Sequence, residues 1–144
     1  MNREMLMLVE AIAREKNVEH DVVFGAVEAA LAQATKKLMQ SDKDHPVQDA
    51  DIRVSIDRDT GDYETFRRWL VVDDAAGLQN PDAEEMLMDA VERVPDIQVD
   101  EYIEESVASV PIGRIGAMAA KQVILQKIRD AEREMLLNEF MSRG

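Results

Sequence analysis

The sequence predicts an α+β fold: an N-terminal helical hairpin, a small mainly antiparallel β-sheet and a long C-terminal helix. Two patterns support this. Apolar residues recur at helical spacing near both ends of the chain, whereas in the middle they alternate with polar residues. The chain has 144 residues, of which 46% are hydrophobic, and this is enough for the core of one domain.

The first two helices are predicted over residues 1–16 and about 19–39. The polar segment between them breaks the helical pattern, and Asn17 suits the C-terminal cap of the first helix. The apolar spacing predicts two buried faces: Met1, Met5, Leu8, Val9 and Ile12, then Val23, Ala26, Val27, Ala30, Leu31 and Ala34. Periodicity leaves open whether Leu6, Met7 and Phe24 are core residues or surface anchors for a partner.

A β-hairpin is predicted over residues 52–72. Polar residues separate the apolar positions Ile52, Val54 and Ile56. The Asp-Thr-Gly-Asp segment at 59–62 is a turn signal, and apolar residues follow it. Because successive side chains of a strand point to opposite faces, we expect one of Arg67 and Arg68 to pack beside Trp69 and the other to be exposed.

The remaining segments are less regular. Residues 40–50 are polar and predict a flexible loop, and a short helix is predicted from about Pro81 to Pro95. One more strand is expected within 97–111. The helix predicted over 112–142 is long, at roughly 45 Å. Its apolar positions are Ile115, Ala119, Val123 and Ile128 in one stripe, and Ala117, Ala120, Ile124, Ala131, Met135 and Phe140 in another.

The charge is unevenly distributed. The net charge is −13, and the excess of acids falls in residues 41–111, with 20 acids against 6 bases. This acidic middle should repel phosphates, so a general nucleic-acid binder is unexpected and any contact with RNA must be local. The less acidic segments 1–40 and 112–144 have net charges of −1 and +2.

Composition also argues against catalysis and metal binding. The sequence has no Cys and only two His, His20 and His45, so we expect no metal site and no cofactor. No nucleophile–base arrangement stands out. Without a long apolar run or a signal-peptide pattern, the chain is expected to be soluble and cytoplasmic.

A Gly-x-x-Gly motif at 113–116 opens the long helical pattern. Such a loop clamps the nucleic-acid backbone in KH domains, so one hypothesis is an independent KH-like module that binds single-stranded RNA. A KH loop joins two helices, however, whereas the residues before Gly113 are strand-like, and acids stand just upstream. The other interpretation is that Gly113 and Gly116 allow the helix to start close to a neighbouring strand.

Several segments, taken in order, resemble a known family. They are MNREMLMLVEAIAREKNV (1–18), ALAQATKK (30–37), VSIDRDTGDYETFRRWLVVD (54–73) and GRIGAMAAKQVILQKIRDAERE (113–134). Together they resemble the N-terminal domain of the bacterial transcription elongation and termination factor NusA, over nearly the whole chain. The resemblance implies that 1–144 is one such polymerase-binding domain and that the S1 and KH domains of these factors lie downstream, outside this sequence.

This resemblance also implies a function and partners. The domain would dock on core RNA polymerase near the β-flap tip and the RNA exit channel, without catalysis. It would promote pausing and hairpin-dependent termination and take part in antitermination. Further implied partners are the nascent RNA hairpin, the C-terminal domain of the polymerase α subunit and, through the full-length protein, other antitermination factors. We expect a monomer without membrane contact.

The basic residues that match the family pattern are Lys36, Lys37, Arg114 and Lys121. By resemblance, they would face the RNA hairpin. The simpler interpretation of Lys36 and Lys37 is that they only complement the dipole at the end of the second helix. Two departures from the family pattern are a longer loop at 40–50 and a loose match over 74–96.

Overall fold

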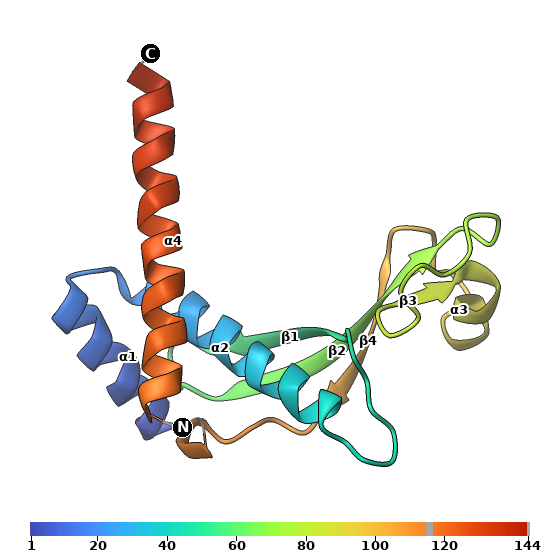
Figure 1. Cartoon of the computed structure of the whole chain (residues 1–144), viewed down its shortest axis with the longest axis horizontal. Helices are drawn as coiled ribbons and strands as arrows, with labels where there is room; N and C mark the ends of the chain where they lie inside the picture. Colours follow the sequence, from blue (N-terminus) through green and yellow to red (C-terminus); the bar gives the residue numbers. More distant parts are fainter. Residues whose placement is uncertain (115–116, 144) are drawn as a thin grey trace. The chain divides into compact units, whose positions relative to one another are not determined.

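The computed structural model describes residues 1–114 and 117–143, and the side chains of these residues except 114, 117–121, 123 and 140–143. It confirms the α+β fold with a long C-terminal helix (Figure 1). In chain order the elements are α1 (Arg3–Lys16), α2 (His20–Gln40), β1 (Asp51–Ile56), β2 (Tyr63–Val72), β3 (Glu84–Met86), α3 (Leu87–Arg93), β4 (Tyr102–Val107), the 3-10 turn η1 (Ile112–Arg114) and α4 (Ala117–Arg143).

The elements are distributed over two compact units, and each unit combines separate stretches of sequence. The first, called the helical unit, consists of Met1–Leu31, Ser55–Tyr63 and Val110–Gly144. The second, called the sheet unit, consists of Ala32–Val54 and Glu64–Ser109.

Both ends of α1 are capped, the C-terminal end by Asn17 as predicted. The Asn2 Oδ1 atom accepts a hydrogen bond from the backbone N–H of Met5, and Asn17 takes the left-handed conformation at the C-terminal end. The buried residues of the helix are Met5, Val9, Ile12 and Ala13. The prediction that Met1 is buried is wrong, because Met1 precedes the helix and its amino group lies 3.4 Å from the Asp62 carboxylate.

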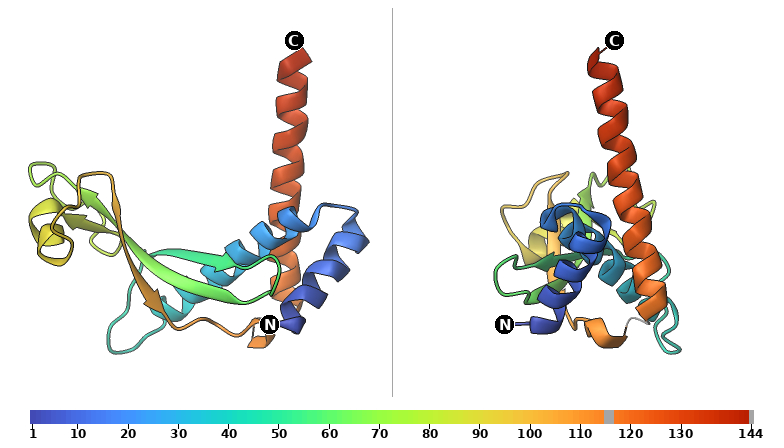
Figure 2. Two further views of the ribbon diagram at one scale, coloured as in Figure 1. Left: turned by 180° about the vertical axis from the view of Figure 1, so that it is seen from behind. Right: turned by 90° about the vertical axis from the view of Figure 1, so that its left-hand side faces the viewer.

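The core of the helical unit joins α1, the first part of α2, the end of β1 and α4. It includes Phe24, which is therefore a core residue, whereas Met7 is exposed. Ile124 and Ile128 of α4 are buried as predicted, but Met135 is exposed, although it lines a shallow groove with Val18 and Val22 beside the α1–α2 turn. Helix α4 continues past this turn (Figure 2). The other predicted positions of α4, Ile115, Ala117, Ala119, Ala120, Val123 and Phe140, lie outside the described side chains, and Ala131 is half-buried.

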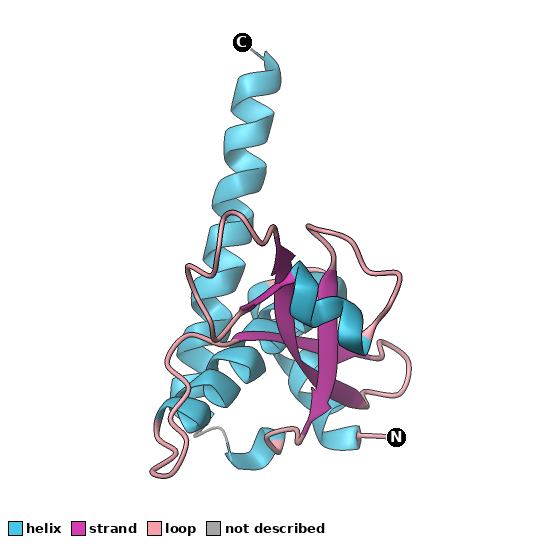
Figure 3. Cartoon of the chain, turned by 90° about the vertical axis from the view of Figure 1, so that its right-hand side faces the viewer, coloured by secondary structure: helices cyan, strands magenta, loops and turns pink. Residues whose placement is uncertain are grey.

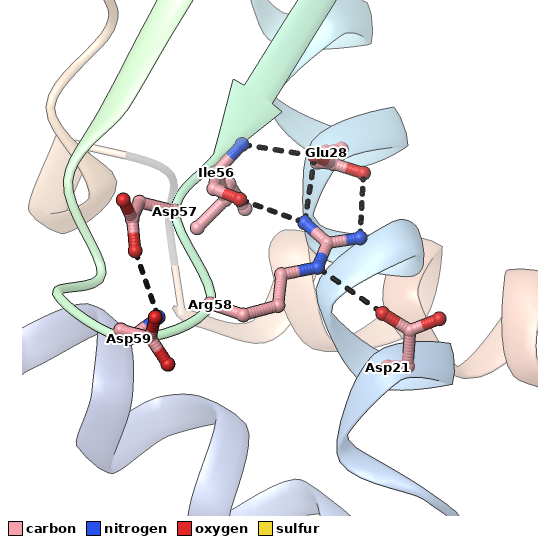
Figure 4. A network of polar contacts seen from close by, with 6 residues as sticks. All are labelled: Asp21, Glu28, Ile56, Asp57, Arg58 and Asp59. Carbon is pink, nitrogen blue, oxygen red and sulfur yellow. Dashed lines mark hydrogen bonds and ion pairs between the residues drawn. The ribbon is translucent and has the colours of Figure 1, made fainter.

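Arg58 in the β1–β2 turn connects this turn to α2 (Figure 4). Its guanidinium donates to both carboxylate oxygens of Glu28, at 2.9 and 3.4 Å, to Asp21 Oδ1 at 3.1 Å and to the Ile56 carbonyl at 2.9 Å. Glu28 also accepts from the backbone N–H of Ile56. The hydrogen bonds from Glu28 raise the pKa of Arg58, so this guanidinium stays charged.

The sheet has four strands in the order β1-β2-β3, with β4 also paired to β2 (Figure 3). The predicted hairpin of β1 and β2 is confirmed. β4 runs antiparallel to β2, with Thr65 opposite Val107 and Leu70 opposite Tyr102. β3 adds a short parallel pairing, with Leu70 opposite Glu84, and makes the sheet mixed.

The predicted helix from Pro81 to Pro95 is only half right. Residues 87–93 are helical, but 84–86 form β3 instead. The Ala83 carbonyl accepts a hydrogen bond from the Leu70 N–H, and Glu84 Oε1 accepts from the N–H groups of Gln79 and Asn80. These contacts hold the segment extended, and pairing with β2 overrides its helical propensity.

Helix α3 covers one face of the sheet. A small core forms there from Val71, Ala90, Ile97 and Ile103, with Trp69 and Leu87 packed against it. Arg67 lies over the Trp69 ring, 4.6 Å from its centroid, as predicted for one of the two arginines. The prediction that the other is exposed is wrong, because Arg68 is half-buried over the ring of Tyr102 on the opposite face.

The segment predicted as a flexible loop at 40–50 is a loop from residue 41 onward, and it contains hydrogen-bonded turns. The backbone N–H of Val47 bonds to the Met39 carbonyl, and Asp42 Oδ1 accepts from the N–H groups of Asp44 and His45. No helix in the described ranges 1–114 and 117–143 is both long and apolar enough to cross a membrane.

Candidate functional site

Lys36 and Lys37 lie near the C-terminal end of α2, where their charge complements the helix dipole. They differ in environment. The Lys36 Nζ atom lies 3.6 Å from the Asp49 Oδ1 atom, and the Lys36 side chain is 37% exposed. Lys37 is more exposed. Part of the positive charge in this basic pair is therefore balanced by the loop that follows α2.

The groove beside Lys36 contains both signs of charge. It encloses about 310 Å³ and is lined by Lys36, Asp49, Ala50, Asp51, Ile52, Asn80 and Ala83. The Asn80 side-chain amide donates to the backbone and side-chain oxygens of Asp49, at 3.2 and 2.9 Å. These bonds hold the Asp49 carboxylate near Lys36. A phosphate that approaches Lys36 must therefore compete with Asp49, whereas Lys37 faces solvent.

The other two basic residues belong to the helical unit. The backbone of Arg114 ends η1, and that of Lys121 lies in the first turns of α4, but both side chains fall outside the described part of the structure. Because Lys36 and Lys37 belong to the sheet unit, the grouping of all four residues into one basic patch stays a prediction.

The Gly-x-x-Gly motif does not join two α-helices. Gly113 lies in η1, after β4, and Gly116 lies outside the described residues. A Cβ atom on Gly113 would lie 3.3 Å from Glu4 Oε1, so this position packs closely on the start of α1. A neighbouring carboxylate is unfavourable for a phosphate clamp, so the setting of Gly113 argues against the KH interpretation. The close neighbour found at Gly113 belongs to helix α1 and not to a strand as expected.

Sequence reasoning missed a network of arginines and aromatic rings on the sheet. Arg53 of β1 donates two hydrogen bonds of 2.9 Å to the carboxylate of Glu104 on β4, and its guanidinium lies 4.7 Å from the Phe66 ring centroid. The Arg68 Nε atom lies 3.5 Å from Glu104 Oε1. The Arg53 hydrogen bonds lower the pKa of Glu104. The alternation in each strand was visible, but the register that aligns these residues was not.

The described residues hold no group of three or more His, Cys, Asp or Glu side chains that could bind a metal ion. The His20 ring pairs with Glu10 at 2.5 Å on the surface, and this is an exposed contact between α2 and α1. The fold and the charge together define a class: a strongly acidic α+β domain.

Comparison with known proteins makes this class specific. The family model described as "NusA N-terminal domain" matches residues 4–134. The transcription termination/antitermination protein NusA of Bacillus subtilis is 32% identical over 143 residues, and that of Halalkalibacterium halodurans is 31% identical over 144. The chain therefore belongs to the NusA N-terminal domain family, and its relatives are named as transcription factors.

A solved structure supports the same assignment. The solution structure of the N-terminal domain of NusA from B. subtilis matches with a TM-score of 0.57 and 32% identity. The match covers 92% of this chain and 99% of that one. The two curated relatives are covered only in part: the alignments span 99% of this chain but 36% and 35% of the relatives, so the chain spans about a third of their length.

Proposed function

We propose that this chain is a transcription-factor domain that docks on RNA polymerase near the β-flap and the RNA exit channel. There it promotes pausing and hairpin-dependent termination, takes part in antitermination and performs no catalysis. The observation that carries the proposal is the match of the NusA N-terminal domain model to residues 4–134. The relatives named as termination/antitermination proteins extend this match to 99% of the chain.

The domain acts by differential binding. A paused polymerase with an RNA hairpin at its exit channel would be bound better than an elongating one, and the pause would lengthen by that difference in affinity. Lys37, Arg114 and Lys121 would contribute positive charge towards the hairpin phosphates. Lys36 would contribute less, because its ammonium group already pairs with Asp49.

The first test is a titration of the labelled chain with core RNA polymerase and with polymerase that lacks the β-flap tip. We expect saturable binding to the intact enzyme at micromolar concentration and a clear loss of binding without the tip. Equal binding to both enzymes would place the contact elsewhere on the polymerase. Absence of saturable binding to intact core polymerase would refute the docking function.

The second test concerns the basic residues. The double substitution Lys37→Glu with Arg114→Glu should leave folding intact, since Lys37 is exposed and changes of exposed charges rarely alter stability by more than about 0.5 kcal/mol. It should weaken the hairpin-dependent pause but not polymerase docking. Lys16→Glu, at the exposed end of α1, is the matched control and should alter neither. Loss of docking in the double variant would mean that these residues face protein rather than RNA.

A further inference from the structure

The outer face of α3 exposes apolar side chains within an acidic region. Leu87 and Ala90 point towards the sheet, whereas Met88, Val91 and Val94 are exposed, Met88 by 57%. Met88 and Val91 are three residues apart and therefore neighbours on the helix surface. Asp89, Glu92 and Asp96 are exposed beside them. These six residues are called the α3 surface below.

The segment that contains α3 is strongly acidic. Residues 73–105 contain twelve acids and a single base, Arg93. The Arg93 side chain already has partners within the sheet unit. Its guanidinium donates to Glu85 at 3.2 Å and to Glu105 at 2.7 Å, and it lies 5.3 Å from the Trp69 ring centroid. The one positive charge of this region is thus neutralised, and the α3 surface faces outward with acidic side chains around its apolar ones.

The α3 surface is also held in place, although the helix has only seven residues. Met86, at the cap position, makes no side-chain hydrogen bond to the helix, but Asp74 Oδ1 from the preceding loop accepts from the Met88 N–H at 3.1 Å. Ala90 is fully buried, and the Arg93 side chain connects the helix to β3 and β4. Figure 1 shows α3 beside β3. A surface fixed in this way loses little entropy when a partner binds.

We propose that the α3 surface binds a polypeptide segment in which Lys or Arg residues flank one or two apolar side chains. The apolar side chains of the segment would cover Met88 and Val91, and its cations would pair with Asp89, Glu92 and Asp96. Charge complementarity favours such a segment over nucleic acid, whose phosphates this region repels. The inference rests on the proposed function, because it assigns the segment to RNA polymerase.

The first test compares the affinity of the full chain for core polymerase with the affinities of a double variant and of a control variant. Met88→Ser with Val91→Ser removes the apolar contacts, and about tenfold weaker binding is expected, as for anchor residues of an interface. Met135→Ser is the matched control, because Met135 is an exposed methionine on α4, 68% exposed, and it should bind within about twofold of the unchanged chain. Circular dichroism verifies that each variant folds.

A second variant tests the charges with little change of shape. Asp89→Asn with Glu92→Gln should weaken binding and reduce its dependence on salt. A photo-reactive amino acid in place of Met88 should crosslink to a polymerase peptide that contains basic residues, which would support the inference. Crosslinks to RNA, or to peptides without basic residues, would overturn it.

The outcomes separate the two proposals. If the unchanged chain binds polymerase and both double variants bind equally well, the α3 inference is wrong and the docking function stands. If the unchanged chain does not bind, both are refuted.

Discussion

Glu28 is the acceptor through which α2 holds the β1–β2 turn. Its carboxylate is largely shielded, with 23% of the side chain exposed, and it accepts from Arg58 and from the backbone N–H of Ile56. Asp21 pairs with the same arginine, but its side chain is 79% exposed. Removal of the Glu28 carboxylate should therefore cost more stability than removal of the Asp21 carboxylate. Only the loss of Glu28 leaves a part-buried backbone donor, the Ile56 N–H, without its acceptor.

We expect Glu28→Ala to lower the free energy of unfolding by about 1–3 kcal/mol, the usual cost of an unsatisfied buried donor and a lost charged hydrogen bond. Asp21→Ala should cost less than about 0.5 kcal/mol. Urea denaturation of both variants measures the difference. Equal losses would show that the shielding of Glu28 does not matter.

The ion pair of Arg53 with Glu104 predicts a dependence on pH. The hydrogen bonds from Arg53 lower the pKa of Glu104 in the folded chain. On acidification, the Glu104 carboxylate is therefore protonated at a higher pH in the unfolded chain than in the folded chain. The stabilisation is therefore complete above the ordinary pKa of 4.5 and is lost as the pH falls through the lower folded-state value. In Arg53→Ala the Glu104 pKa should rise towards 4.5, which NMR titration of the carboxyl carbon would detect; an unchanged titration would contradict the pairing.

Among the elements, α1 depends on the tight turn between β1 and β2. Gly61 in this turn has a φ of +78°, and a Cβ atom there would lie 2.6 Å from the Asn2 carbonyl oxygen and 3.0 Å from Leu6 Cγ. The backbone N–H of Asn2 donates to the Thr60 carbonyl at 2.8 Å. The start of α1 thus packs directly on the turn. Gly77 has a similar φ of +71°, but no atom lies within 4 Å of its Cβ position.

This pair of glycines separates backbone strain from steric clash. We expect Gly77→Ala to cost about 1–2 kcal/mol, the penalty of the left-handed conformation alone. Gly61→Ala should cost at least about 1 kcal/mol more, because the first turn of α1 must also move. Thermal or urea unfolding of both variants tests the difference, and equal destabilisation would mean that α1 does not rest on this turn.

The elements also show what the sequence could and could not predict. α1, α2 and the β1–β2 hairpin carry clear periodicities and were predicted close to their observed bounds. The long helix was predicted to begin at residue 112, but residues 112–114 form the 3-10 turn η1 and α4 spans Ala117–Arg143. β3 was missed, because Glu84–Met86 have no strand pattern and become extended only by pairing with Leu70–Val72. For the same reason the contacts of Arg53 and Arg68 with Glu104 were not predictable: they depend on the register of strands distant in sequence.

At the scale of the whole molecule, the two units differ in net charge. The sheet unit contains 17 acidic and 7 basic residues, a net charge of −10, and the helical unit contains 13 and 10, a net charge of −3. Lys36 and Lys37 therefore lie in the more acidic unit. Sequence reasoning could identify the four basic residues by family resemblance, but it could not foresee the pairing of Lys36 with Asp49.

We accordingly expect the isolated chain to bind single-stranded RNA no more tightly than roughly 10⁻⁵ M at physiological salt, within the range of non-specific contacts. Fluorescence anisotropy with labelled RNA, repeated at several salt concentrations, measures this. Sub-micromolar binding with a salt dependence equivalent to several phosphates would instead support the independent KH-like module.

The way in which the units are assembled has a consequence for mapping experiments. The chain passes from one unit to the other four times, after residues 31, 54, 63 and 109, so no contiguous fragment consists of one whole unit alone: residues 32–109 include the sheet unit but also part of the helical unit. A deletion series would remove part of a unit at every step, and lost binding would then report a broken scaffold instead of a missing contact. Interaction sites on this domain are best located by single exposed substitutions in the intact chain.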